Sequence, residues 1–270
     1  RPNPIPLYAE MGSINPVFVL PGAIAERAEQ MAQAFIGSLT MGVGQFCTNP
    51  GLILIPSGDQ GDQLVQSIAQ HAAAAAPGTM LHSGIHDAFT KGVARIKDTD
   101  GVQLLSQAKG PREQACCTIA VTDFAVLQRE RSLLEELFGP CSTIVRYENA
   151  SQMIEVAQAL EGQLTATLHG SDSELSEHQP LIRSLQQKVG RLIFNGFPTG
   201  IEVCHAMVHG GPYPATSDAH FTSIGPAAIK RFTRPLCFQD FPNDYLPAEL
   251  QDANPRGIMR MVNGVFTRDQ

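Results

Sequence analysis

The apolar residues near the start of the chain form a short run and then a helical stripe. The run VFVL at 17–20 stops at Pro21, which is typical of a short buried strand followed by a turn. Between residues 24 and 43 apolar positions recur three or four residues apart, so a helix with one buried face is expected. Glycines end this helix, and a tight loop follows up to Gly51.

A continuous apolar run at 52–56 predicts a strand that is buried on both faces. Similar patterns predict strands at 116–121, 142–146, 166–168 and 192–194, and helices at 61–75, 80–96, 151–161 and 174–189. Strands that alternate with helices of about ten residues favour an α/β domain with an open, largely parallel sheet.

The last third of the chain has a different character. Gly, Pro and His interrupt residues 196–223 so often that a long loop is expected, and long loops within a domain are usually functional. The stretch 257–266 is apolar and predicts an edge strand or an oligomerisation arm. We therefore divide the chain into a main domain at 1–234 and a C-terminal tail at 235–270.

Charge and cysteine content exclude several classes of protein. A net charge of −7 argues against a non-specific nucleic-acid binder. No apolar run approaches the roughly 20 residues that span a bilayer, so no membrane partner is expected. The six cysteines are scattered and form no CxxC pair, which indicates reduced thiols in a cytoplasmic protein.

The segment with the clearest chemical potential is GQFCTNPG at 44–51, which contains Cys47. A cysteine in a loop after a helix can be exposed, and its free N–H can donate to a developing oxyanion. A thiolate in this position is a strong nucleophile. The same residue type also occurs as an inert small side chain in protein cores, so the loop alone decides nothing.

Three segments, in order, resemble motifs of the aldehyde dehydrogenase superfamily, specifically of its C-terminal, catalytic half. The cysteine loop is one. EMGSINP at 10–16 is similar to the general-base segment, and EELFGP at 135–140, followed by the strand at 142–146, is similar to the nicotinamide-side segment. Weaker similarity runs from about residue 7 to residue 230.

The residues in and around these motifs resemble those of one branch of that superfamily. Ser13-Ile14 follows Gly12 where most members have Gly-Lys. FNGFPTG at 194–200, HGGPYPAT at 209–216 and AIKRFTRP at 228–235 resemble α-ketoglutarate semialdehyde (2,5-dioxovalerate) dehydrogenases, with NADP-dependent fatty aldehyde dehydrogenases as close relatives.

The resemblance implies a three-layer α/β catalytic domain and a set of catalytic roles. Cys47 would attack the aldehyde to give a thiohemiacetal and, after hydride transfer, an acyl-thioester. Glu10 would activate water for deacylation, and Asn195 would orient Cys47 or Glu10. The substrate would be a small aldehyde, such as a semialdehyde, and no metal is implied.

The resemblance also implies cofactor and substrate contacts. Glu136 would hold the nicotinamide ribose of NADP or NAD, with Phe138 against the ring and Gly12 beside them. The implied aldehyde pocket is formed by Phe46, Thr48, Phe197 and Tyr213. A C-terminal strand would pair with a neighbouring subunit, so a homodimer or homotetramer is expected.

Each of these residues also has an ordinary structural interpretation. Glu10 is also compatible with a solvated or ion-paired surface acid, and Glu136 with the start of a turn. Phe138 is also typical of a core residue. Asn195, at the end of a predicted strand, is also typical of a turn residue that bonds to nearby backbone.

Three other classes of function compete with the dehydrogenase. The pairs His82/His86 and His205/His209 are spaced as zinc ligands on a helix, but neither contains the general base of His-Glu-x-x-His, and neighbouring glycines disfavour helix. A cysteine hydrolase would need a histidine close to Cys47 in space. A purely structural, oligomerising module would share the fold and lack the activity.

The N-terminal cofactor-binding domain of the family would precede Arg1, so a truncated or cleaved chain is expected. Gly42-Val43-Gly44 is no substitute, because it follows a helix and a dinucleotide fingerprint follows a strand. PYPA at 212–215 also stands where most members have Pro-Phe-Gly-Gly. The isolated chain is therefore expected to bind cofactor poorly and to lack dehydrogenase activity, while Cys47 retains thiol reactivity.

Overall fold

The computed structural model describes residues 2–107, 111 and 114–269. Residues 1–231 and 232–270 form two separate units, and each is described by itself. The division lies three residues from the boundary that the sequence predicts. Along the described residues, no helix combines the length and apolar character needed to cross a membrane.

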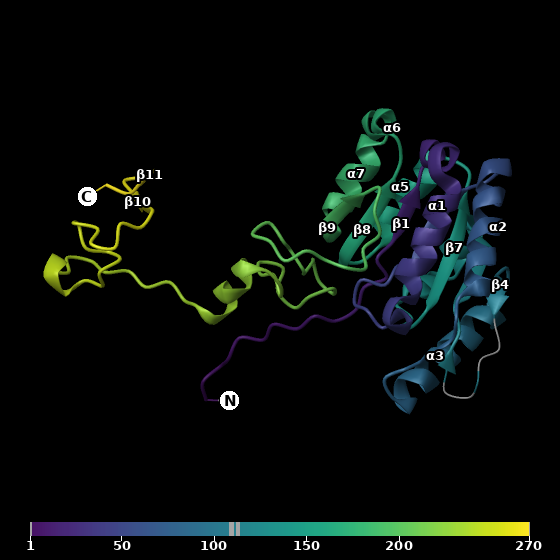
Figure 1. The fold of residues 1–270 in the computed structure, drawn as a ribbon, viewed down its shortest axis with the longest axis horizontal. Helices are drawn as coiled ribbons and strands as arrows, with labels where there is room; N and C mark the ends of the chain where they lie inside the picture. Colours follow the sequence, from purple (N-terminus) through teal and green to yellow (C-terminus); the bar gives the residue numbers. More distant parts are fainter. Residues whose placement is uncertain (1, 108–110, 112–113, 270) are drawn as a thin grey trace. The chain divides into compact units, whose positions relative to one another are not determined.

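A seven-stranded sheet organises the first unit (Figure 1). Its order is β4 (Gln103–Gln107), β6 (Thr118–Asp123), β7 (Cys141–Tyr147), β2 (Leu52–Pro56), β1 (Val17–Val19), β8 (Gln163–His169) and β9 (Val189–Phe194). All neighbours are parallel except β4, which pairs antiparallel with β6 at one edge. The expected largely parallel sheet is confirmed.

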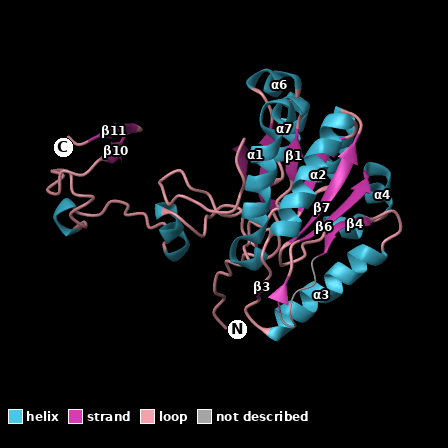
Figure 2. Ribbon diagram, turned by 45° about the vertical axis from the view of Figure 1, so that its right-hand side comes forward, coloured by secondary structure: helices cyan, strands magenta, loops and turns pink. Residues whose placement is uncertain are grey.

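Alternate residues of the central strands enter two different cores, because successive side chains of a strand point to opposite faces. Val17 and Ile53 pack with α1 (Pro21–Thr40) and α2 (Asp59–Ala74), which run side by side along the sheet in Figure 2. Their neighbours Phe18 and Leu54 pack with helices on the other face. Those helices are α3 (Ser83–Asp98), α4 (Phe124–Arg129), α5 (Ala150–Ala159) and α7 (Gln179–Gln186). The result is the three-layer α/β architecture that was expected.

Shorter elements complete this unit. They are the 3-10 helices at Met41–Gly44, Arg131–Leu134 and Pro226–Phe232, the helix α6 (Asp172–Glu177), and an antiparallel pair of β3 (Gly78–Thr79) with β5 (Gln114–Ala115). The single helix predicted at 174–189 is wrong. It is two helices that meet at His178, and Pro180 lies in the first turn of α7, where its missing N–H costs no hydrogen bond.

The second unit contains a β-hairpin where the sequence suggested one strand. β10 (Arg260–Val262) pairs antiparallel with β11 (Val265–Thr267). Asn263 and Gly264 between them both have positive φ, 51° and 82°, which a two-residue hairpin turn requires. A 3-10 helix at Asn243–Tyr245 precedes the hairpin.

The topology brings the three sequence motifs to one edge of the sheet. The segment 10–16 leads directly into β1, the cysteine loop precedes β2, and the segment 135–140 precedes β7. These three strands are neighbours and parallel, so their amino ends meet at the same edge. Residues that are more than a hundred positions apart are therefore expected to lie together there.

Candidate active site

Cys47 follows a strained turn at the end of α1. Gly42, Val43 and Gly44 have φ values of 56°, 60° and 65°, and positive φ in a β-branched residue such as Val43 is a genuine outlier. Close packing holds the turn: a Cβ on Gly44 would lie 2.3 Å from the backbone carbon of Gly139. This turn reverses the chain after the helix, and its packing holds the cysteine loop against the segment 135–140.

Asn15 fixes the cysteine loop from below. Its buried side chain donates through Nδ2 to the carbonyl oxygens of Cys47, at 2.9 Å, and Asn49, at 3.0 Å. Gln163, at the start of β8, accepts from the N–H of Ile14 at 2.7 Å. Within the described part of the chain the Cys47 N–H has no acceptor, so it is available to a ligand. Sequence reasoning missed both amides, because nothing local distinguishes them from ordinary turn residues.

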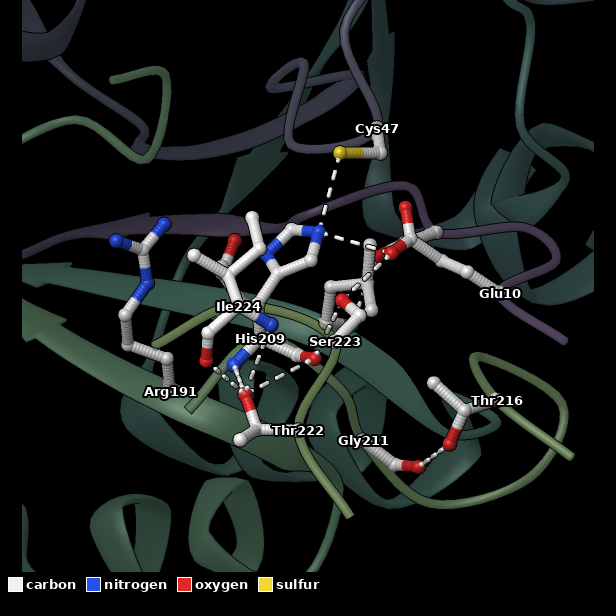
Figure 3. A network of polar contacts seen from close by, with 12 residues as sticks. Glu10, Cys47, Arg191, His209, Gly211, Thr216, Thr222, Ser223 and Ile224 are labelled. Carbon is white, nitrogen blue, oxygen red and sulfur yellow. Dashed lines mark hydrogen bonds and ion pairs between the residues drawn. The ribbon is translucent and has the colours of Figure 1, made fainter. Parts of the chain in front are cut away.

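His209 joins Cys47 to Glu10 (Figure 3). Its Nε2 lies 3.3 Å from the Cys47 Sγ and 3.0 Å from the Glu10 Oε2. The His209 side chain is 4% exposed and that of Glu10 is 29% exposed, so the imidazole is shielded from solvent and the carboxylate is partly accessible. The Ser223 hydroxyl shares its one proton between the same Glu10 oxygen, at 3.3 Å, and the His209 carbonyl oxygen, at 3.0 Å.

The loop after β9 holds His209 in place. The N–H of His209 donates to Thr222 Oγ1 at 2.8 Å, and its carbonyl oxygen accepts from the Ser223 N–H at 2.8 Å. A Cβ on Gly190 would lie 2.1 Å from the carbonyl oxygen of Gly210, so the loop packs directly on β9. The functional loop expected at 196–223 therefore supplies a site residue, but its partner could not be identified from sequence.

The charges of this cluster support one another. Hydrogen bonds that the His209 ring donates to Cys47 and then to Glu10 raise the pKa of His209 to about 9, against the effect of burial. The hydrogen bond from His209 is the main cause that lowers the pKa of Glu10. At neutral pH an imidazolium therefore lies between a carboxylate and the sulfur. A positive group beside a cysteine is the usual environment of reactive thiols.

Glu136 and Phe138 line a surface groove against α3, and His82 and Arg95 contribute to its wall. Glu136 Oε2 accepts from the Ser13 N–H at 3.3 Å, and a Cβ on Gly12 would lie 3.1 Å from that oxygen. Partial removal from water raises the pKa of Glu136 to about 7, and the Glu10 charge acts in the same direction. Phe138 is 38% exposed, so its ring is open to a ligand.

Other predicted site residues lie elsewhere. Asn195 donates to and accepts from the backbone of Gly170, each at 3.0 Å, and also bonds to Arg27, rather than to Cys47 or Glu10. This arrangement fits the turn interpretation that the sequence left open. Phe197 packs against Phe35 of α1, with ring centroids 5.7 Å apart.

The remaining pocket candidates divide into two groups. Thr48 is buried and its carbonyl oxygen faces the hydroxyl of Thr199 at 3.5 Å, while Phe46 is 39% exposed and covers Gly42. Both are adjacent to Cys47. Tyr213 is 77% exposed.

The two histidine pairs weighed as zinc ligands differ in structure. His82 is the N-cap of α3 and His86 lies in its first turn, so the expectation that Gly84 disfavours helix there is wrong. In the described part of the chain, neither belongs to a group of three possible metal ligands. Residues 201–211 are loop, and His205 is exposed. Among the described residues, the group of His, Cys, Asp and Glu side chains that could hold a metal is Glu10, Cys47 and His209.

Comparison with known proteins identifies the family of the chain. Residues 3–224 match the model of the aldehyde dehydrogenase family, and the chain belongs to this family. Alpha-ketoglutaric semialdehyde dehydrogenase 2 of Azospirillum brasilense is 46% identical over 266 residues, covering 98% of this chain and 51% of the relative. Alpha-ketoglutaric semialdehyde dehydrogenase of Acinetobacter baylyi is 41% identical over 272 residues, covering 100% and 52%. The chain spans about half the length of these curated relatives.

Solved structures share the fold. A bifunctional proline utilization A protein superposes with a TM-score of 0.72 at 23% identity, covering 86% of this chain and 23% of that chain. An indole-3-acetaldehyde dehydrogenase complexed with NAD+ gives 0.70 at 18% identity, covering 84% and 46%. The shared architecture is that of aldehyde dehydrogenase catalytic domains.

Proposed function

We propose that this chain carries the catalytic centre of an NAD(P)-dependent dehydrogenase that oxidises a semialdehyde to the carboxylic acid. The observation that carries the proposal is the contact of Cys47 with His209, and through it with Glu10, at the amino edge of the sheet. The matching family and the names of the relatives support the reaction type and the substrate class.

In the first step the Cys47 sulfur attacks the carbonyl carbon of the aldehyde. A carbon–sulfur bond forms, and the carbonyl oxygen takes up the negative charge as the carbon becomes tetrahedral. The Cys47 N–H can donate to this oxygen, and Asn15 holds the cysteine loop in place through its hydrogen bond to the Cys47 carbonyl oxygen. The His209 imidazolium supplies the nearest positive charge, because its Nε2 lies 3.3 Å from the sulfur.

Glu136, Phe138 and Gly12 fit the nicotinamide end of the cofactor. The partly desolvated Glu136 carboxylate can pair with ribose hydroxyls, and the exposed Phe138 ring can lie against a flat heterocycle. Gly12 leaves the space that a side chain would fill in front of Glu136. When bound, NAD(P)+ supplies the acceptor for the aldehyde hydrogen and its electron pair. The carbon attached to Cys47 is then at the oxidation level of a thioester.

Hydrolysis of this thioester requires a base beside Cys47. Glu10 can take a proton from water, whose oxygen then attacks the acyl carbon and releases the Cys47 thiolate and the acid. Ser223 and His209 both bond to Glu10 Oε2 and hold the carboxylate in place. The products are therefore one carboxylic acid and the regenerated cysteine.

Arg191 supports an acidic substrate. Its side chain reaches from β9 towards the loop, where Nη2 donates to the Pro198 carbonyl oxygen at 2.9 Å and Nε is buried without a partner. In Figure 3 it lies on the side of His209 opposite Glu10. Burial lowers the pKa of Arg191, and the nearby Cys47 sulfur acts in the opposite direction. A carboxylate at the far end of a short semialdehyde would form an ion pair with this half-buried guanidinium.

A chimera tests the proposal. These 270 residues replace the matching segment of the Azospirillum relative, and formation of NADH or NADPH is measured with 2,5-dioxovalerate. We expect aldehyde-dependent reduction that Cys47→Ser abolishes and Cys237→Ser, at an exposed cysteine of the second unit, leaves intact. A folded chimera that reduces neither cofactor would contradict the proposed reaction.

A cysteine hydrolase is the second candidate, and the closeness of His209 to Cys47 is the observation that favours it. The geometry differs from a hydrolase triad, since both Cys47 and Glu10 approach the same ring nitrogen. Sustained turnover of thioesters without nucleotide, at rates that cofactor does not change, would favour this alternative.

We also propose that the protein is cytoplasmic and oligomeric. The six cysteines are free, as in a reducing compartment. The exposed hairpin β10–β11 carries apolar side chains, Met261, Val265 and Phe266 among them, that a second subunit could cover. Light scattering that shows only monomers would remove the oligomer proposal.

A further inference from the structure

We propose that Cys47, His209 and Glu10 form a binding site for zinc, or for a similar soft divalent cation, that blocks the catalytic cysteine. The three residues come from the cysteine loop, the loop after β9 and the segment before β1. One ligand atom of each lies within 4.8 Å of the others. Thiolate, neutral imidazole and carboxylate are the three ligand types that zinc takes in proteins. Zinc would therefore displace the Nε2 proton of His209, which is released to water.

The observed distances are close to those of a coordinated ion. Zinc bonds of about 2.3 Å to sulfur and about 2.0–2.2 Å to nitrogen and oxygen give tetrahedral ligand separations of about 3.4–3.6 Å. The structure has 3.3 Å between Sγ and Nε2 and 3.0 Å between Nε2 and Oε2. Shifts of a few tenths of an ångström would therefore admit the ion between these two pairs of atoms.

Neighbouring residues hold two of the ligands in position. Ser223 donates to Glu10 Oε2, and Thr222 accepts from the backbone N–H of His209, so the carboxylate and the backbone that carries the imidazole are already held in place. Bonded neighbours of this kind commonly strengthen metal binding. Glu10 and Cys47 are both partly accessible, which leaves an entry path and a fourth position for water. The positive charge of Arg191 acts on Cys47 and opposes the binding of a cation there. The site therefore favours a cation that forms a strong bond to sulfur.

The site selects against magnesium and calcium, which prefer oxygen ligands. A bound zinc ion would occupy the space that the aldehyde and the deacylation water need. Its effect on aldehyde oxidation rests on the proposed function, whereas binding itself rests only on the three side chains. The ion is thus an inhibitor of the site and not a participant in the reaction.

Two measurements on the purified 270-residue chain test this inference. In the first, a chromogenic chelator competes with the protein for zinc. We expect one tight site, a loss of affinity of about 100-fold or more in Cys47→Ser, and a loss of about 10-fold in Ser223→Ala, as for other residues that orient a ligand. The control is the double variant Cys204→Ser/His205→Gln, which removes an exposed cysteine and an exposed histidine from the same loop as His209 and should bind as the wild type does.

In the second measurement, limited iodoacetamide labels the wild-type chain with zinc, with magnesium or with zinc and EDTA. Zinc should protect Cys47, magnesium should not, and EDTA should restore labelling. Unchanged labelling of Cys47 in zinc would overturn the inference, as would loss of the tight site in the Cys204/His205 control. Zinc binding to the chain together with a folded chimera that does not oxidise the aldehyde would contradict the proposed function alone. Aldehyde oxidation by the chimera that zinc does not inhibit would contradict this site alone.

Discussion

Replacing His209 by glutamine removes a positive charge that the structure places between Cys47 and Glu10. The pKa of His209 is raised from 6.5 to about 9, mainly by its hydrogen bonds to these two residues. Because His209 is 4% exposed, solvent weakens this effect little. A shift of roughly 2.5 units corresponds to about 3 kcal/mol of unfolding free energy.

The sign of the pH dependence follows from the direction of the shift. A histidine whose pKa is raised in the folded state binds its proton more tightly there. Its stabilisation is therefore complete below the unfolded value of 6.5 and is lost as pH rises through about 9. His209→Gln should lower the unfolding free energy more at about pH 5.5 than at about pH 10, by up to about 3 kcal/mol.

Urea unfolding at the two pH values measures this difference directly. The difference between pH values removes the part of the mutational cost that does not depend on charge, such as lost packing. His220→Gln is the matched control, since the His220 side chain is 89% exposed. An equal loss of stability at both pH values for His209→Gln would refute the assigned ion pair.

Three further predictions follow from particular contacts. Gly44→Ala should lower the unfolding free energy by roughly 2–3 kcal/mol or more, because the new Cβ would lie 2.3 Å from Gly139 and the backbone of Gly44 has positive φ. The control Gly37→Ala, which has open space in a helix, should be neutral or stabilising. Equal melting temperatures for the two variants would contradict this reasoning. Glu136→Gln should raise the unfolding free energy by about 1 kcal/mol at about pH 8 and not at about pH 4. The raised pKa means that the ionised carboxylate destabilises the folded state, and solvent screens part of this cost. A gain in stability at both pH values would count against this reasoning. In the chimera, Arg191→Met should raise KM for 2,5-dioxovalerate about 10-fold or more and leave a neutral aldehyde unaffected; equal effects on both substrates would argue that Arg191 has only a structural role.

The spacing of apolar residues in the sequence was sufficient to predict the layers of the fold. Apolar runs such as 52–56 identified the central strands, because strands buried on both faces need apolar residues at every position. The edge strand β4 was missed, since QLLSQ at 103–107 has polar ends and is too short to show a period. The hairpin at 260–267 was also missed, although Asn263-Gly264 is a strong signal for a two-residue turn.

The candidate site was only partly predictable. Cys47, Glu10 and Glu136 lie on motifs, and each motif immediately precedes a strand of a parallel sheet, so their meeting at one edge follows from topology. His209 lies in a loop whose path depends on packing against Gly190 and Thr222, which no local pattern encodes.

The positioning amides were equally hidden from sequence reasoning. Asn15 bonds to residues 32 and 34 positions along the chain, and Gln163 bonds to Ile14, which is 149 positions away. For Asn195 the motif matched, but the side chain bonds to Gly170 and Arg27. The motif matches thus identified residues that the fold brings together, but not the residues that hold them in position.

The claim that Cys47 is the nucleophile is tested most directly by trapping its acyl form. The purified chain and its Glu10→Gln variant are incubated with p-nitrophenyl acetate without nucleotide, quenched and digested, and the acetyl group is located by mass spectrometry. The account predicts acetyl on Cys47, with more of it accumulating in Glu10→Gln because deacylation lacks its base. Acetyl on any of the other five cysteines in preference to Cys47, or none on Cys47 in a folded chain, would contradict the account.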